Sequence, residues 1–147
     1  MSTLLKAGLL TTTLFAGAAS ASTLEITVTN EQGAGGLYLT PLLSIFHDGT
    51  FDSFDEGGSA TPGVQLLAEE GMVSGVVNEV GLSNPDAKTE VVANPAGFGG
   101  APVLDPGEVT TITVDLDTST QRFFSFLSMV IPSNDTFIGN DNPEAYE

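Results

Sequence analysis

The sequence contains no cysteine and no tryptophan, and it has only three basic side chains and one histidine among its 147 residues. The absence of cysteine excludes disulfides, thiol chemistry and thiolate metal ligands. The shortage of lysine and arginine leaves a net charge of -16. This charge argues against binding to nucleic acid or to an anionic membrane, because both partners require clustered cations. The acidic excess is compatible with cation binding or with a solvated surface suited to salty water.

The first 21 residues have the pattern of a secretory signal peptide. A short segment with one lysine precedes a modest apolar run, and residues 19–21 (A-S-A) have the form of a cleavage site. No later stretch is long and apolar enough to span a bilayer. We therefore expect one exported domain over residues 22–147, located in the periplasm or outside the cell. Lys88 and Arg122 are its only cations, and export without cysteine is typical of bacterial proteins.

Alternation of apolar and polar residues predicts a mainly β domain. Strands are expected at residues 23–30, 37–46, 89–94, 109–117 and 122–131. The last of these is the most apolar and is expected to be central, whereas Pro41 favours an edge position or a bulge. The residues after Ile131 are expected to form polar loop. The resulting fold class is an antiparallel two-sheet β-sandwich with one or two short helices in a connection.

Two short helices are expected in the connection between the second and third strands. Thr61 is placed to cap the first helix, with Pro62 at its first position, and Gly71 ends it. The second helix is expected over residues 72–80 and should be limited to one or two turns, because Gly75 lowers helix propensity. Both segments carry apolar faces, so we expect a lid over the end of a sheet.

The sequence offers little support for catalysis. His47 and Asp48 are adjacent, a pair that suggests acid–base or metal chemistry. Adjacent residues on a strand point to opposite faces, however, and no second histidine is present. No nucleophile elbow, phosphate-binding glycine loop or HExxH pattern occurs either. We expect a non-enzymatic protein; the alternative of a hydrolase using His47 and Asp48 lacks a nucleophile.

Several carboxylates are candidates for a hard cation such as calcium, which takes oxygen ligands. Adjacent or alternate pairs occur at Asp55 and Glu56, Glu69 and Glu70, and Asp115 and Asp117. The last pair shares one face of a predicted strand, a spacing found at sheet-end cation sites and equally on exposed strands.

Asp135 stands apart from these pairs, on a short polar loop after Pro132. Phe137 and Ile138 follow it and are expected to anchor the loop to the core, and Asp141 lies beyond them. The pattern fits either a plain turn or part of a cation site, for which Asp135 is the stronger candidate and Asp141 the weaker.

Three longer segments occur in the order YLTPLLSIFHDG, FDEGGSATPGVQLLAEEG and SMVIPSNDTFIG. Together they resemble the spondin N-terminal domain family, in its short bacterial secreted form, from about residue 24 to residue 140. The resemblance implies a sandwich of about eight antiparallel strands with C2-like character and a bound calcium ion. It implies adhesion in extracellular matrix for animal members, and it implies that Asp135 is a calcium ligand.

In that family further carboxylate ligands come from a later D-A-G-T-(D/E) segment, which this sequence does not contain. Asp141 or Glu144 are the local candidates to replace it. We expect either a calcium-associated secreted domain that binds a surface or matrix protein or a glycan, or a purely structural envelope or matrix domain with an incomplete metal site. A domain truncated at its C-terminus would lack a final strand, which predicts an unpaired sheet edge and lower stability or association.

Overall fold

The structure is a computed structural model that describes residues 21–94 and 101–147. The predicted signal peptide therefore lies outside the described residues except for its last residue. The described elements are β1 (Ala21–Thr29), β2 (Tyr38–Leu39), β3 (Leu42–His47), α1 (Pro62–Glu70), α2 (Ser74–Ser83), β4 (Lys88–Val92), β5 (Val109–Asp117), β6 (Phe123–Ile131) and β7 (Phe137–Gly139).

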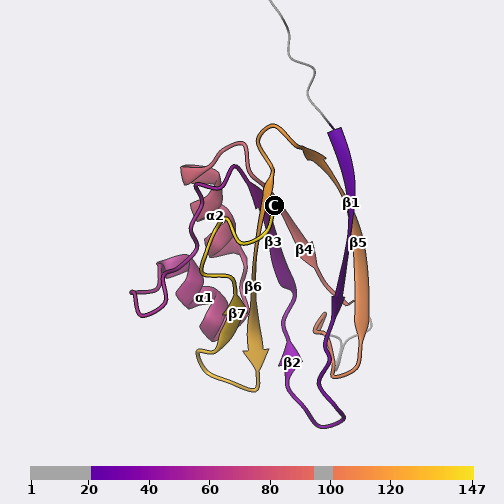
Figure 1. Ribbon diagram of the computed structural model, residues 1–147. Helices are drawn as coiled ribbons and strands as arrows, with labels where there is room; N and C mark the ends of the chain where they lie inside the picture. The colour runs from indigo at the N-terminus through magenta and orange to yellow at the C-terminus, as the bar shows by residue number, and fades with distance from the viewer. Residues whose placement is uncertain (1–20, 95–100) are drawn as a thin grey trace, which may run out of the picture.

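The strands form two antiparallel sheets that face each other (Figure 1). One sheet contains β1 and β5, which pair along their whole length from Ala21 opposite Asp117 to Thr29 opposite Val109. The other has the order β2-β6-β3-β4, and β7 also pairs with β6. The predicted antiparallel two-sheet sandwich with two short helices is confirmed, and β6 is the central strand that residues 122–131 predict.

Pro41 interrupts the pairing of β2 and β3 with their common partner β6. Leu39 lies opposite Val130, whereas Leu43 lies opposite Leu127. The segment from Leu39 to Leu43 advances by four residues while β6 advances by three, from Val130 to Leu127. One extra residue on one of two paired strands is the geometry of a β-bulge. Of the two alternatives that Pro41 predicts, an edge position or a bulge, the structure has the bulge, and it falls where a missing backbone N–H costs the sheet nothing.

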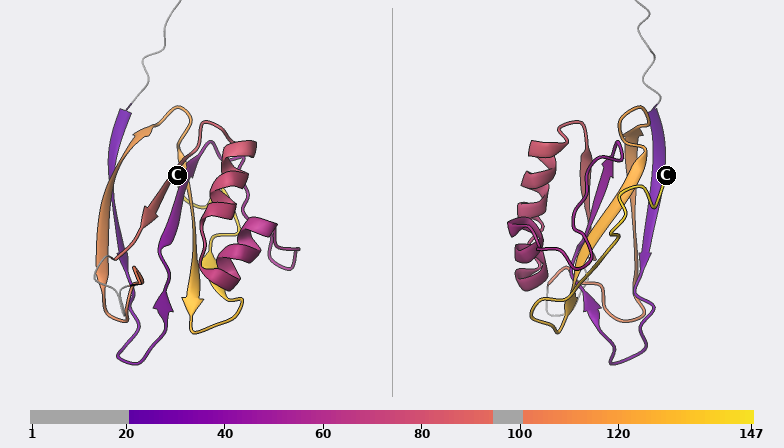
Figure 2. Two further views of the ribbon diagram at one scale, coloured as in Figure 1. Left: turned by 180° about the vertical axis from the view of Figure 1, so that it is seen from behind. Right: turned by 60° about the vertical axis from the view of Figure 1, so that its left-hand side comes forward.

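The two helices cover the face of the larger sheet that points away from β1 and β5 (Figure 2). Val64 and Leu67 of α1 and Val76 and Val80 of α2 are buried in one core cluster with residues of β3 and β6. A smaller cluster, centred on Phe46, joins the two sheets. The expectation of a lid over the end of a sheet is therefore wrong, because the apolar helix faces pack flat on a sheet face.

Helix α1 has the ends that its sequence predicts. Thr61 Oγ1 accepts a hydrogen bond from Val64 N–H at 3.2 Å, and Pro62 is the first helical residue. Gly71 adopts a left-handed conformation with φ 69°, and its N–H donates to Leu67 O. This conformation is free of steric cost only for a residue without Cβ.

Two elements differ from the sequence prediction. Helix α2 has 10 residues, nearly three turns, and continues past residue 80, because Val76 and Val80 are held in the core despite Gly75. Strand β7 lies within the segment predicted to be loop. A three-residue strand has too little alternation to be recognised from the sequence. It forms here because its backbone pairs with the edge of β6.

Chain segments beyond β7 cover part of the β6 edge. Phe126 N–H donates to Asn140 Oδ1, and Phe124 N–H donates to Tyr146 O, both at 2.9 Å. This part of the β6 edge is therefore covered. Within the described residues β1 pairs only with β5, so its second edge is open. Lower stability or association stays a prediction.

Candidate functional site

Asp135 lies in the loop between β6 and β7, whose shape is set by its own hydrogen bonds. Val130 N–H donates to Thr136 O at 2.8 Å, and Thr136 N–H donates to Ser133 Oγ at 3.2 Å. The Phe137 ring packs edge-on against Phe54 with 5.0 Å between centroids and joins the core. Asp135 itself is exposed.

Only one of the two expected anchors of this loop packs against the core, and it is partly buried. Ile138 points away from Phe137, as neighbours on a strand do, and 38% of its surface is exposed. The expectation that both residues hold the loop against the core is therefore right for Phe137 and wrong for Ile138.

Within the described residues, Asp135 is not part of a cluster of acidic side chains. Calcium takes about six to eight oxygen ligands. Across residues 21–94 and 101–147, no group of three or more histidine, aspartate or glutamate side chains is arranged to hold a metal ion. Asp141 Oδ1 instead accepts a hydrogen bond from Glu56 N–H at 2.7 Å. Asp141 therefore contacts the loop before α1.

The paired carboxylates on β5 have structural partners. Asp115 Oδ1 accepts a hydrogen bond from Thr23 Oγ1 on β1 at 2.7 Å. Asp117 Oδ1 accepts from the hydroxyl and the N–H of Ser119, at 2.6 and 2.9 Å, and the hydroxyl is the larger of the two causes that lower the pKa of Asp117. The contact of Asp115 links β5 to β1, and the contacts of Asp117 close the turn after β5. These structural roles account for two carboxylates at alternate positions without a bound cation.

His47 lies at the centre of a buried polar network. Its Nδ1 accepts a hydrogen bond from Gly49 N–H at 3.0 Å, so the ring proton is assigned to Nε2, which donates to Ser125 Oγ at 3.0 Å. Asn140 Nδ2 donates to the same Ser125 oxygen at 3.1 Å. The side chains of His47 and Ser125 are 0% and 1% exposed, so a substrate has no access to them.

Asp48 points away from this network, as the strand periodicity predicts. Its Oδ1 accepts hydrogen bonds from Thr50 Oγ1 at 2.6 Å, Thr50 N–H at 3.0 Å and Asn84 Nδ2 at 2.8 Å. These bonds, the one from the Thr50 hydroxyl foremost, lower the pKa of Asp48 to about 2. Asp48 therefore fixes the chain after β3 to the end of α2 and does not pair with His47 as an acid–base dyad.

Burial gives His47 a pH dependence that can be measured. Desolvation lowers the pKa of His47 below its ordinary value of 6.5, against a smaller opposing effect of Asp48. Between the lowered pKa and 6.5 the unfolded chain binds more protons than the folded protein. The stability contribution is thus fully present above pH 6.5 and is lost as the pH falls through this window. We expect the free energy of unfolding to decrease from pH 7 to pH 5, by at most about 1.4 kcal/mol per pH unit for this one proton.

Urea unfolding at a series of pH values measures this effect. The His47→Gln variant should be less stable than the wild type, yet it should lose the part of the pH dependence between pH 5 and 7. A slope that is unchanged in the variant would assign the titration to another group.

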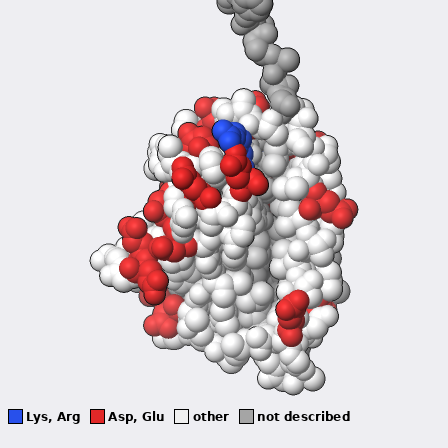
Figure 3. All heavy atoms as spheres, in the orientation of Figure 1, with Lys and Arg blue, Asp and Glu red and all other residues white. Residues whose placement is uncertain are grey.

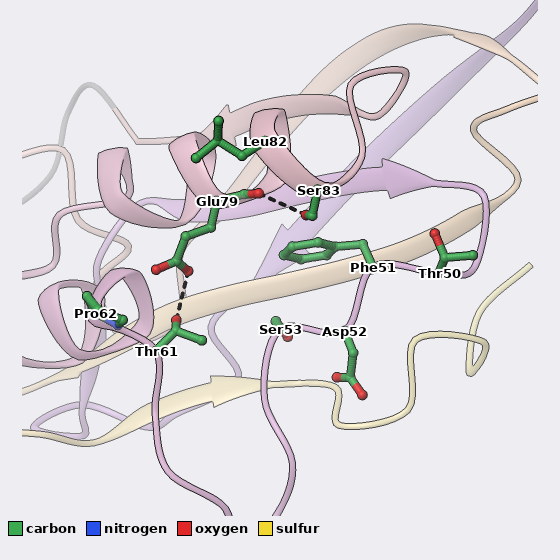
Figure 4. Close-up of a pocket in the computed structure, with 9 residues that line it drawn as sticks. All are labelled: Thr50, Phe51, Asp52, Ser53, Thr61, Pro62, Glu79, Leu82 and Ser83. Carbon is green, nitrogen blue, oxygen red and sulfur yellow. Dashed lines mark hydrogen bonds between the residues drawn. The ribbon is translucent and has the colours of Figure 1, made fainter.

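A groove lies between three segments that are distant in sequence: residues 50–53 after β3, the start of α1 and the end of α2 (Figure 4). We call it the helix–loop groove, and its volume is about 480 Å³. The buried ring of Phe51 forms part of its lining, and Leu82 of α2 stands at its rim with 88% of its surface exposed.

Glu79 ties two walls of the helix–loop groove together. Its Oε1 accepts a hydrogen bond from Gly63 N–H and its Oε2 accepts from Thr61 Oγ1, both at 2.7 Å. A carboxylate of α2 thus satisfies donors at the N-terminal end of α1, where the helix dipole favours negative charge. The groove is therefore held in shape by the protein itself.

The surroundings of the groove are acidic. On the face shown in Figure 3, acidic side chains gather over the helices and the loop before α1. Asp52 is exposed, yet partial desolvation, together with the nearby charges of Asp55 and Asp141, raises the pKa of Asp52 at the groove. The two cations of residues 21–147 are engaged elsewhere: Lys88 Nζ lies 3.7 Å from Glu90, and Arg122 forms an ion pair with Glu147. Among the described residues, neither basic side chain therefore serves as a counter-charge for Asp52 and its neighbours.

Sequence reasoning finds Asp135 and Asp141 but misses the helix–loop groove. Phe51 is recognisable as an apolar anchor in a polar loop, and Leu82 lies beyond the predicted end of its helix. Neither signal shows that the two residues line one groove, because 31 positions separate them and only the packing of α2 on the sheet brings their segments together.

The fold and the groove define a helix-covered antiparallel β-sandwich with an acidic surface. The family model described as Spondin_N matches residues 35–145, which is most of the chain. The protein therefore belongs to the spondin N-terminal domain family, whose members are usually extracellular, and the resemblance in the sequence is confirmed. No curated protein matches the sequence. Among the described helices, none combines the length and apolarity needed to cross a membrane.

Proposed function

We propose that the protein is a secreted, non-enzymatic domain that works by binding a surface or matrix protein or a glycan. The observation that carries the proposal is the family match over residues 35–145. The burial of His47 and Ser125 supports a non-enzymatic role, because the one histidine and its serine partner are sealed in the core. Export through the predicted signal peptide, into the periplasm or the medium, is part of the same proposal.

Calcium enters this proposal through Asp135, which the resemblance makes a ligand. One exposed carboxylate binds calcium weakly, so the ion would need further oxygen ligands such as backbone carbonyls, amides or water. The alternative is a purely structural envelope or matrix domain with an incomplete metal site. The lack of a cluster of three acidic or histidine side chains in the described parts of the chain favours that alternative.

Calcium-dependent melting separates the two functions. For a weak extracellular site, with a Kd of about 1 mM, calcium at ten times the Kd should stabilise the protein by about 1.4 kcal/mol. We expect a saturable rise of the melting temperature with calcium, measured by calorimetry, that is absent from the Asp135→Ala variant. Glu70→Ala, which removes an exposed carboxylate of α1, controls for the loss of charge.

Identical melting of wild type and Asp135→Ala across the calcium range would remove Asp135 as a ligand and leave the structural alternative. Saturable retention of the labelled protein on cell or matrix surfaces tests the binding role itself. Retention no greater than that of an unrelated protein of equal negative charge would contradict the proposal.

A further inference from the structure

We propose that the helix–loop groove docks a basic segment of a partner protein, in which an apolar side chain stands next to a lysine or arginine. The inference rests on the proposed binding function and gives it a surface and a class of partner. Leu82 would contact the apolar side chain, and Asp52 would pair with the cation.

The shape of the groove is already formed before a partner arrives. Glu79 fixes the start of α1 to α2 through its bonds to Thr61 and Gly63, and Asp48 fixes residue 50 to Asn84 just after α2. A volume of about 480 Å³ is enough for one or two side chains. A preorganised groove of this kind loses little conformational freedom when it binds.

The apolar part of the proposed contact is Leu82. It is the most exposed of the large apolar side chains in the described residues, at 88%, although it lies on a helix whose other apolar side chains face the core. An open rim position is covered better by a surface that extends beyond the groove than by a small molecule within it. This favours a protein segment over a free amine as the occupant.

The polar part of the proposed contact follows from charge complementarity. Asp52 lines the groove, and in Figure 4 its carboxylate points toward the C-terminal segment, where Asp141 lies. Asp55 adds a third negative charge nearby. Lys88 and Arg122 pair with other carboxylates, so a cation of the partner would supply the counter-charge at the groove. An anionic membrane or nucleic acid would be repelled.

A buried hydroxyl provides an independent observation at the same place. Ser53 lines the groove and is only 4% exposed, and its Oγ has no hydrogen-bond partner among the described residues. A buried polar group without a partner is costly, and a donor or acceptor of a bound segment could satisfy it after a rotation of the side chain.

The test uses a capped pentapeptide of alternating arginine and leucine, titrated into the purified ¹⁵N-labelled protein. We expect the amide signals of residues 50–53 and 79–83 to shift. Leu82→Ala should weaken the affinity about tenfold through lost apolar contact, and Asp52→Asn about threefold through the lost ion pair. Both residues are exposed, so the variants should fold as the wild type does, which circular dichroism verifies. Val109→Ala and Asp86→Asn, at exposed positions that do not line the groove, serve as matched controls.

Specific outcomes overturn the inference. It fails if the peptide shifts signals elsewhere, if neither groove variant weakens binding, or if a peptide with glutamine in place of arginine binds equally well. It also fails if spermine alone binds the groove as tightly, which would assign the site to small amines. Surface retention without peptide binding at the groove would refute the groove as the docking site and leave the proposed function intact. Peptide binding at the groove without surface retention would contradict the proposed function and leave the groove as a peptide-binding site.

Discussion

Replacing Phe46 with alanine should lower the free energy of unfolding by about 3–5 kcal/mol, the cost of removing a buried aromatic side chain and leaving a cavity. Phe46 is 2% exposed, and its ring lies 5.3 Å from that of Phe124 between centroids. It is the largest member of the small cluster that joins β3 to Val114 and Leu116 of β5. In the part of the chain that the structure describes, the sheet of β1 and β5 has two strands, and such a ribbon has little stability without a packed face.

The effect of Phe46→Ala should be unevenly distributed over the molecule. Hydrogen exchange should accelerate most at the amides of β1 and β5, because these strands depend on the smaller cluster. Leu67→Ala is the matched comparison: it removes a side chain that is 0% exposed from the larger cluster and should loosen α1 and α2 first. Equal acceleration of all elements in both variants would show that the two clusters unfold as a single unit.

Replacing Gly75 with alanine should destabilise the protein by about 1–2 kcal/mol, although alanine has the higher helix propensity. A Cβ at Gly75 would lie 2.7 Å from the Cα of Gly63, where α1 and α2 cross. Backbone cannot yield as a flexible side chain does, so the helices must move apart. Overpacking of this kind costs about 1–3 kcal/mol, which exceeds the gain in propensity of at most about 1 kcal/mol.

Gly81 is the matched control on the same helix. A Cβ there meets no atom within 4 Å, and the residue is exposed. Gly81→Ala should therefore stabilise the protein by about 0.5–1 kcal/mol. Urea unfolding of both variants measures the difference in sign. Stabilisation by both substitutions would mean that the helices have room to separate and that the close approach at Gly75 does not constrain them.

Gly75 shows why some features were predictable and others were not. From the sequence it is a weak point in a helix, which predicts a shorter helix than the one observed. In the structure it is the place where α2 approaches Gly63 of α1, and the packing gained there outweighs its low propensity. Local patterns describe a residue and its near neighbours, whereas this contact joins positions 12 residues apart.

The candidate site divides in the same way. The sequence locates Asp135 correctly in a loop after a central strand, because Pro132 and the apolar residues on both sides are local signals. The sequence does not show which carboxylates lie close together in the folded protein. Asp141 approaches Glu56 across 85 positions, and it lies near Asp52 only because β7 returns the chain to the loop before α1.

The sequence by itself determined the mainly β class, the capped helix α1, the irregularity at Pro41 and the strongly acidic charge, because each follows from composition or from residues close together in the chain. Tertiary structure alone decided the length of α2, the existence of β7, the placement of the helices on a sheet face and the helix–loop groove. These features depend on contacts between distant segments, whose free energy outweighs local preference and leaves no periodic signal in the sequence.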